Sequence, residues 1–125
     1  MIDHASIPVR NIKTAAHFYE ALLGTIGFTK LETRSATVGF GKKYPEFWIN
    51  LRAEKIAISD GAHVCFRAQT TDMVDAFHEV GLAQGGKSDG APGLRPHHGD
   101  GYYAAFIRDP DGNRIEAVTF IAALP

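Results

Sequence analysis

Hydrophobic positions recur along the chain in a pattern that predicts the same order of elements twice. Segments 12–23 and 71–80 place apolar side chains on one helical face, while shorter apolar runs alternate as strands do. Strands are expected at 2–9, 29–33, 36–41 and 47–52, and again at 62–68, 86–89, 102–108 and 114–120. The order βαβββ in each half predicts an α+β fold of two pseudo-symmetric modules forming a curled, mixed β-sheet cleft.

Polar residues and glycines mark the expected ends of the helices. Asn11 is the predicted N-cap of the first helix, and Gly24 suits the position that follows it. Either Thr70 or Thr71 is expected to cap the second helix.

Two segments of the second half are expected to lack regular structure. Residues 90–100, rich in glycine and proline, predict a long loop. Residues 109–113, Asp-Pro-Asp-Gly-Asn, predict the turn of a hairpin, because Pro110 pre-sets φ and Gly112 permits positive φ.

Matching residues at a fixed offset of 59 support an internal repeat. The matches are His4 with His63, Phe18 with Phe77, Glu20 with Glu79, Leu23 with Leu82 and Gly27 with Gly86. Some such matches arise by chance, but their order along both halves favours a duplication. The chain is therefore expected to form a single domain over 1–125, with one module at 1–60 and the other at 61–125.

Composition narrows the classes of function. The 125 residues are 45% hydrophobic and carry 13 Lys+Arg against 14 Asp+Glu, so no basic surface for nucleic acid is expected. No apolar run approaches the roughly 20 residues that span a bilayer, and the N-terminus does not resemble a secretory signal. With Cys65 as the single cysteine, no intrachain disulfide is possible. These features predict a cytoplasmic protein that binds neither nucleic acid nor membranes.

Strand alternation predicts that candidate metal ligands lie on the more polar faces of their strands. His63 shares a face with Arg67, and Glu116 shares one with Arg114, each opposite an apolar face. A single strand histidine is more often a hydrogen-bonded side chain than a ligand. However, His4 and His63 occupy equivalent places in the repeat, and two imidazoles with a carboxylate form a good metal-binding set.

Four segments resemble the vicinal-oxygen-chelate superfamily, which includes glyoxalase I, bleomycin-resistance proteins, fosfomycin-resistance enzymes and extradiol dioxygenases. They are 3–9 (Asp-His-Ala-Ser-Ile-Pro-Val), 17–20 (His-Phe-Tyr-Glu), 63–66 (His-Val-Cys-Phe) and 106–116 (Phe-Ile-Arg-Asp-Pro-Asp-Gly-Asn-Arg-Ile-Glu). The resemblance implies paired βαβββ modules around a cleft, usually in a homodimer. It also implies that His4, His63 and Glu116 bind one divalent metal ion, with Fe, Mn, Zn and Ni all compatible.

Two positions depart from parts of this superfamily. Aligning 47–52 with the fourth strand of glyoxalase I puts Asn50 where that enzyme has a glutamate that binds metal and abstracts a proton. An amide is no general base near neutral pH, so a true glyoxalase I is not expected. Phe106 stands where the dioxygenases and fosfomycin-resistance enzymes have a tyrosine, whereas Tyr102 lies further along the same strand face.

The remaining candidates line the expected cleft. Acid–base candidates are Tyr102, His97 and His98, and candidates for substrate binding are Trp48, Asn50, Arg67, Arg95 and Phe106. For each, a plain structural role stays open, such as core packing for Trp48 or solvent exposure for the two loop histidines. Cys65 is expected to be a small buried hydrophobic residue rather than a nucleophile.

Three functions remain open at this point. The first is a metal-dependent lyase, isomerase or dioxygenase-like enzyme acting on a small molecule that chelates the cation through its oxygens. The second is a metal-free protein that sequesters a planar ligand, as the bleomycin-resistance group does, and the third is a sensor without turnover. Whether the cleft closes within one chain or between two also stays open.

Overall fold

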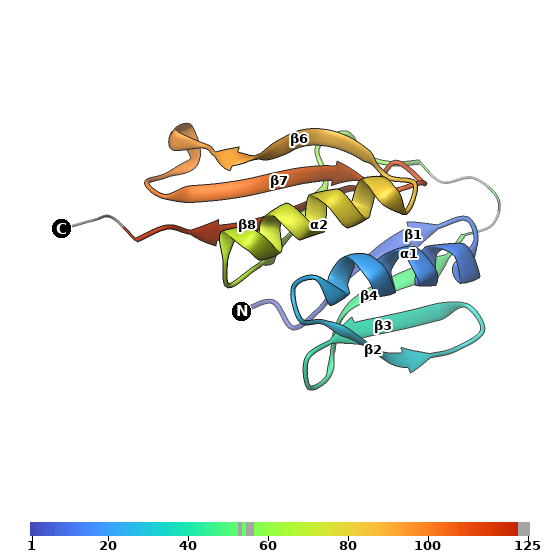
Figure 1. The fold of residues 1–125 in the computed structure, drawn as a ribbon. Coiled ribbons are helices and arrows are strands. Elements are labelled where there is room, and N and C mark those ends of the chain that lie inside the picture. Colours follow the sequence, from blue (N-terminus) through green and yellow to red (C-terminus); the bar gives the residue numbers. More distant parts are fainter. Residues whose placement is uncertain (53, 55–56, 123–125) are drawn as a thin grey trace.

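A computed structural model describes residues 1–52, 54 and 57–122, and it contains the two predicted βαβββ modules (Figure 1). The first module consists of β1 (Ala5–Val9), α1 (Ile12–Gly24), β2 (Thr29–Thr33), β3 (Thr37–Gly41) and β4 (Pro45–Leu51). The second consists of β5 (His63–Arg67), α2 (Thr71–Ala83), β6 (Lys87–Leu94), the 3-10 turn η1 (Pro96–His98), β7 (Tyr102–Arg108) and β8 (Arg114–Phe120). The predicted α+β class is confirmed.

Each module forms its own four-stranded mixed sheet. The strand orders are β1-β4-β3-β2 and β5-β8-β7-β6. In both sheets the first pair of strands is parallel and the others are antiparallel. The strand that opens each module, β1 or β5, is thus an edge strand that lies beside the last strand of the same module.

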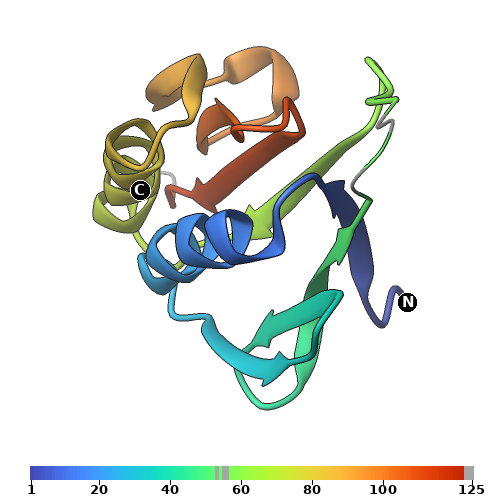
Figure 2. The ribbon, with the colours of Figure 1, turned by 90° about the vertical axis from the view of Figure 1, so that its right-hand side faces the viewer.

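The helices pack together between the two sheets (Figure 2). α1 packs on β3 and β4, and α2 packs on β6, β7 and β8. Inward-facing residues such as Phe18, Phe47, Phe66 and Phe77 form one continuous hydrophobic core. Each sheet therefore buries one face under a helix, and the opposite face is the one available to a site. Within the described residues, neither helix combines the length and apolar character that crossing a membrane requires.

The helix starts follow the predicted capping residues. The Asn11 side chain accepts a bond from the Thr14 amide at 3.0 Å, and the Thr70 hydroxyl accepts one from the Met73 amide at 3.2 Å. The predicted end of the first helix is wrong by one residue, because Gly24 is still helical and Thr25 caps the helix.

The loop predicted at 90–100 is wrong in its first half. Residues up to Leu94 belong to β6, which pairs with β7 through register shifts between Ser88, Gly90 and Gly93. These bulges let a strand accommodate glycines, and an edge strand tolerates Pro92 although it has no N–H to donate. The remaining part contains η1, which holds His97 and His98.

Candidate metal centre

Glu116 is a buried carboxylate on the sheet face that points away from α2. It is 2% exposed. Its Oε2 accepts a hydrogen bond from the Tyr102 hydroxyl, and its Oε1 lies 3.2 Å from Nε2 of His63. Burying a carboxylate is costly unless it is hydrogen-bonded or paired, and these two contacts supply the partners.

Strand pairing brings these three side chains together. β8 lies between β5 and β7, and Glu116 pairs with Cys65 on one side and with Phe106 on the other. His63 sits two residues before Cys65 on the same face of β5, and Tyr102 shares a face with Phe106 on β7. Residues 53 positions apart in sequence are therefore neighbours in the sheet.

The surroundings of Glu116 keep two neighbouring groups, the Tyr102 phenol and the Cys65 thiol, in their protonated forms. Desolvation and the hydrogen bond to Glu116 raise the pKa of the Tyr102 phenol, which makes it a donor rather than a base at neutral pH. Desolvation and the nearby Glu116 charge raise the pKa of the Cys65 thiol to about 12. Cys65 is exposed rather than buried as predicted, yet its thiol stays protonated and is a poor nucleophile.

A cavity of about 370 Å³ opens beside Glu116. Its lining includes the predicted metal ligand His63 and the acid–base candidates Tyr102 and His98. It also includes Phe106, a predicted substrate contact. The His98 ring packs against Tyr102, with centroids 5.1 Å apart.

Two further predicted residues contact side chains that line this cavity. The His97 ring lies against the His98 ring, with centroids 4.2 Å apart. The Arg95 guanidinium lies over the Phe106 ring, 5.4 Å from its centroid. Neither His97 nor Arg95 is itself among the lining residues of this cavity.

His4 does not join this group within one chain. It precedes β1, its side chain is 56% exposed, and its Nδ1 lies 2.7 Å from the Asp3 carboxylate. It lines a separate crevice of about 890 Å³ between the modules, which His63 also lines but Glu116 does not. Over residues 1–52, 54 and 57–122, no three His, Cys, Asp or Glu side chains are placed to hold a metal ion.

The first sheet has no carboxylate at the place that corresponds to Glu116. α1 and α2 start 59 residues apart, so Ser6 of β1 corresponds to Cys65 of β5. Ser6 pairs with Trp48, as Cys65 pairs with Glu116. Trp48, rather than the Asn50 that the alignment with glyoxalase I singled out, therefore takes the place in the first sheet that Glu116 has in the second. Neither an indole nor an amide can serve as a general base.

The other predicted substrate contacts lie away from the cavity beside Glu116. Asn50 accepts a hydrogen bond from the Thr37 hydroxyl at 2.6 Å, and Trp48 has the Arg34 guanidinium 5.3 Å from its ring centroid. Arg67 lies over the Phe120 ring at 4.5 Å and lines the crevice between the modules.

Sequence reasoning missed an ion-paired group in the lining of the same cavity. Arg114 lies two residues before Glu116 on the same face, and it pairs with Asp60 at 3.3 Å and with Asp89 at 3.7 Å. Its Nε is buried and has no hydrogen-bond partner within the described residues. The position of Arg114 on the same strand face as Glu116 could have indicated this group. Asp89 gave no such signal, because it lay at the end of a short predicted strand.

Comparison with known proteins identifies the family. The family model described as the Glyoxalase/Bleomycin resistance protein/Dioxygenase superfamily matches residues 1–117. The chain belongs to this superfamily.

Individual proteins are similar to this chain over almost its whole length. A virulence protein of Salmonella typhimurium is 29% identical over 133 residues, covering 96% of this chain and 84% of that protein. A crystal structure of a glyoxalase/bleomycin resistance protein from Albidiferax ferrireducens is 32% identical, with a TM-score of 0.84 over 93% of this chain and 96% of that one. The fosfomycin resistance protein FosX from Mesorhizobium loti shares the fold, with 18% identity and a TM-score of 0.71 over 97% of this chain and 92% of its own.

Proposed function

We propose that the chain is a metal-dependent superfamily enzyme, a lyase, isomerase or dioxygenase-like enzyme, acting on a small molecule that chelates a divalent cation through its oxygens. The observation that carries this proposal is the 3.2 Å approach of the His63 imidazole to the buried Glu116 carboxylate at a cavity. Imidazole nitrogen and carboxylate oxygen form a donor set that Fe, Mn, Zn and Ni accept.

The third ligand in this proposal is His4 of a second copy of the chain. In one chain His4 is exposed and apart from Glu116, so its ring is available to another molecule. The sheet face that carries Glu116 is not covered by the helices of its own chain. Members of the superfamily are typically dimeric, and a dimer with two such shared sites follows from this arrangement.

The chain's own residues have distinct roles in this proposal. The bound cation would act as a Lewis acid toward vicinal substrate oxygens. Tyr102 holds one Glu116 oxygen and so orients the carboxylate. His98, which lines the same cavity, is the candidate proton carrier, and Phe106 forms an apolar wall whose ring contacts the Arg95 guanidinium.

Glyoxalase I activity is not part of the proposal. That reaction uses a metal-binding glutamate as its base, and here the corresponding corner holds Trp48, with Asn50 next on the same face. We therefore expect no appreciable isomerisation of hemithioacetals by the metal-loaded protein.

A heterodimer of two defective chains tests the shared site. His4→Ala and His63→Ala are each expected to abolish metal binding in their own homodimers. Co-expressed with different tags and purified as a heterodimer, they restore one intact site, which combines His4 of one chain with His63 and Glu116 of the other. Metal analysis should then give about half of the wild-type content. If the wild type binds metal but the heterodimer does not, His4 of the second copy is not a ligand of the site.

Turnover has to be tested separately from metal binding. Metal-loaded wild type is to be screened with catechols, epoxides, α-keto acids and hemithioacetals. Turnover of one of the first three that is lost in Glu116→Gln supports the enzyme. Ligand-dependent thermal shifts without turnover would favour a binding or sensing role instead.

The crevice between the modules supports a second candidate function, metal-free sequestration of a planar ligand. It has a volume of about 890 Å³, within the range of small-molecule sites, and Phe28, Phe47 and Phe66 contribute to its lining. Planar aromatic compounds that raise the melting temperature in excess EDTA, in wild type and His63→Ala alike, would support this alternative. Shifts that require metal would contradict it.

A further inference from the structure

The turn between β7 and β8 is closed by its own hydrogen bonds. The Gly112 amide donates to the Asp109 carbonyl at 2.9 Å, and the Asp109 amide donates to the Asn113 carbonyl at 2.9 Å. The Asp109 side chain also accepts from the Asp111 and Asn113 amides at 3.0 and 2.8 Å. Gly112 has φ +93°, as such a turn needs. The hairpin is thus complete without help from the first module.

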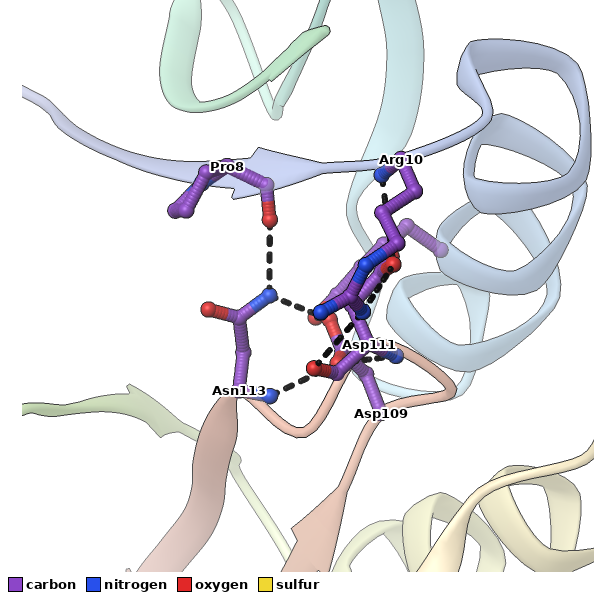
Figure 3. A network of polar contacts seen from close by, with 6 residues as sticks. Pro8, Arg10, Asp109, Asp111 and Asn113 are labelled. Atoms are coloured by element: carbon purple, nitrogen blue, oxygen red, sulfur yellow. Dashed lines mark hydrogen bonds and ion pairs between the residues drawn. The ribbon is translucent and has the colours of Figure 1, made fainter. Parts of the chain in front are cut away.

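The same turn makes a second set of contacts, and these cross to the first module (Figure 3). The Asn113 side-chain amide donates to the Pro8 carbonyl of β1 at 2.9 Å. Asp111 accepts from both the backbone amide and the guanidinium of Arg10, each at 3.2 Å. We call the turn 109–113 with Pro8 and Arg10 the inter-module clasp.

Tyr19 of α1 extends the clasp into the core. Its hydroxyl donates to the Asp109 carboxylate at 2.5 Å, and both side chains are buried. Asp109 is therefore shared between the turn and the first helix, which fixes the turn against α1 as well as β1.

The clasp occupies the free edge of β1. The Val9 carbonyl accepts from the Arg52 amide on the β4 side, so the backbone groups of Pro8 and Arg10 face the opposite edge. There the side chains of Asn113 and Asp111 take the places that a neighbouring strand's carbonyl and amide groups would take. An unpaired strand edge is otherwise free to slide or to pair elsewhere.

The clasp joins β1 to the start of β8, and two of the three candidate ligands lie on or next to these strands. His4 directly precedes β1, and Glu116 lies three residues after Asn113 on β8. The corresponding turn of the first module, Lys42–Tyr44, contacts Glu46 of its own sheet through the Lys42 amide, at 3.5 Å. The described residues therefore hold one clasp, and it connects the ends of the two strands.

We propose that the inter-module clasp sets the angle between the two sheets and thereby positions the metal ligands, with Asp111 as a positioning residue. This inference rests on the proposed metal site. In a dimer with shared sites, the angle within each chain fixes where its His4 meets the His63 and Glu116 of the other copy. Loosening the clasp therefore changes ligand geometry without removing a ligand.

Asp111 is the cleanest residue for the test. Its side chain is 12% exposed, and its carboxylate accepts hydrogen bonds from Arg10, whereas only its backbone amide bonds within the turn. Asp111→Ala should weaken Co(II) binding about tenfold, the size typical of groups that orient ligands, and should alter the visible Co(II) spectrum. Asp111→Asn keeps the acceptor for the Arg10 amide and should stay near the wild-type affinity.

Thr70→Ala is the matched control. It removes the cap of α2, and so lowers stability, but it leaves the clasp and the ligand strands unchanged. Its Co(II) affinity and spectrum should be those of wild type. If Asp111→Ala binds Co(II) as tightly as Thr70→Ala, the positioning role is overturned.

A metal-free measurement separates the clasp from the metal proposal. Spin labels at Lys43→Cys and Glu79→Cys, both exposed, report the distance between modules in a Cys65→Ser background. The labelled chain is diluted into excess unlabelled chain, so that only distances within one chain are read. Asp111→Ala should broaden the distance distribution. If wild type binds no metal, the metal site fails while this measurement still decides the clasp, and an unchanged distribution overturns it.

Discussion

The two modules have the same strand order and the same helix packing, but they differ at the ladder position where the second sheet has the buried carboxylate of Glu116. At equivalent ladder positions the first sheet has Trp48 and the second has Glu116. Around Glu116 the second module adds Tyr102 as a hydrogen-bond donor and His63 at 3.2 Å. The repeat thus preserved the buried faces, which packing constrains, while the uncovered faces were free to diverge.

The helices show the same contrast within the repeat. Phe18 and Phe77 are equivalent and both fully enclosed, with 1% and 0% exposure. Leu23 and Leu82 are also equivalent, yet Leu23 is 0% exposed and Leu82 is 42% exposed. A shared residue type therefore does not imply a shared environment, and only some of the matched pairs should behave alike on substitution.

The largest expected effect concerns Phe18 and Phe77, the equivalent pair that is buried in both modules. Phe18→Ala and Phe77→Ala should each lower the free energy of unfolding by about 3–5 kcal/mol, because each leaves a cavity in the continuous core. Urea unfolding followed by fluorescence and by circular dichroism is the measurement. If one variant lost much less than the other, or if two transitions separated, the modules would not form a single cooperative unit.

Leu23 and Leu82, the equivalent pair that differs in burial, supply the control for this prediction. Leu23→Ala should cost about 2–5 kcal/mol, whereas Leu82→Ala, already exposed, should stay within about 1 kcal/mol of wild type. Similar losses from both would contradict the difference in burial.

Substitution of Glu116 should lower metal affinity, whereas substitution on the uncovered face of the first sheet should not. Glu116→Gln keeps the shape of a buried side chain but removes the proposed anionic ligand, so metal affinity should fall by about a hundredfold or more. Asn50→Ala, on the uncovered face of the first sheet, should leave it unchanged. Isothermal titration with Zn(II) or Co(II) measures both, and equal effects would remove the functional distinction between the modules.

A smaller loss is expected from the donor that orients Glu116. Tyr102→Phe removes the hydroxyl but keeps the ring against His98, and metal affinity should fall about tenfold. Tyr44→Phe changes an exposed tyrosine in the first module and is the matched control. Unchanged affinity in Tyr102→Phe would show that the carboxylate is oriented without the phenol.

The smallest effect is a pH dependence at the clasp. Burial raises the pKa of Asp109, in spite of its hydrogen bonds to Tyr19 and Asn113. A raised native pKa gives stability that is present below the unfolded value of about 3.9 and is lost as pH rises through the native value. Wild type should therefore gain stability relative to Asp109→Asn as pH falls through this window. Urea midpoints at several pH values measure it, and a constant difference would contradict the raised pKa.

Much of the fold was predictable because it rests on local periodicity. The helical stripes, the caps at Asn11 and Thr70 and the Asp-Pro-Asp-Gly-Asn turn are written in neighbouring residues. The β6 error shows the limit of such reasoning. Glycine and proline predict a loop in isolation, but an edge strand with bulges accommodates them once β7 offers a pairing partner.

The candidate site divides in the same way. By itself the sequence determined the repeat, the superfamily resemblance and the face of each strand, because alternation in a strand needs no information from elsewhere in the chain. Only the tertiary structure decided that His63, Glu116 and Tyr102 meet while His4 stays apart, that Trp48 rather than Asn50 mirrors Glu116, and that the 109–113 turn binds β1. These outcomes depend on strand register and on the packing of one module against the other, and both are set by contacts between residues far apart in the chain.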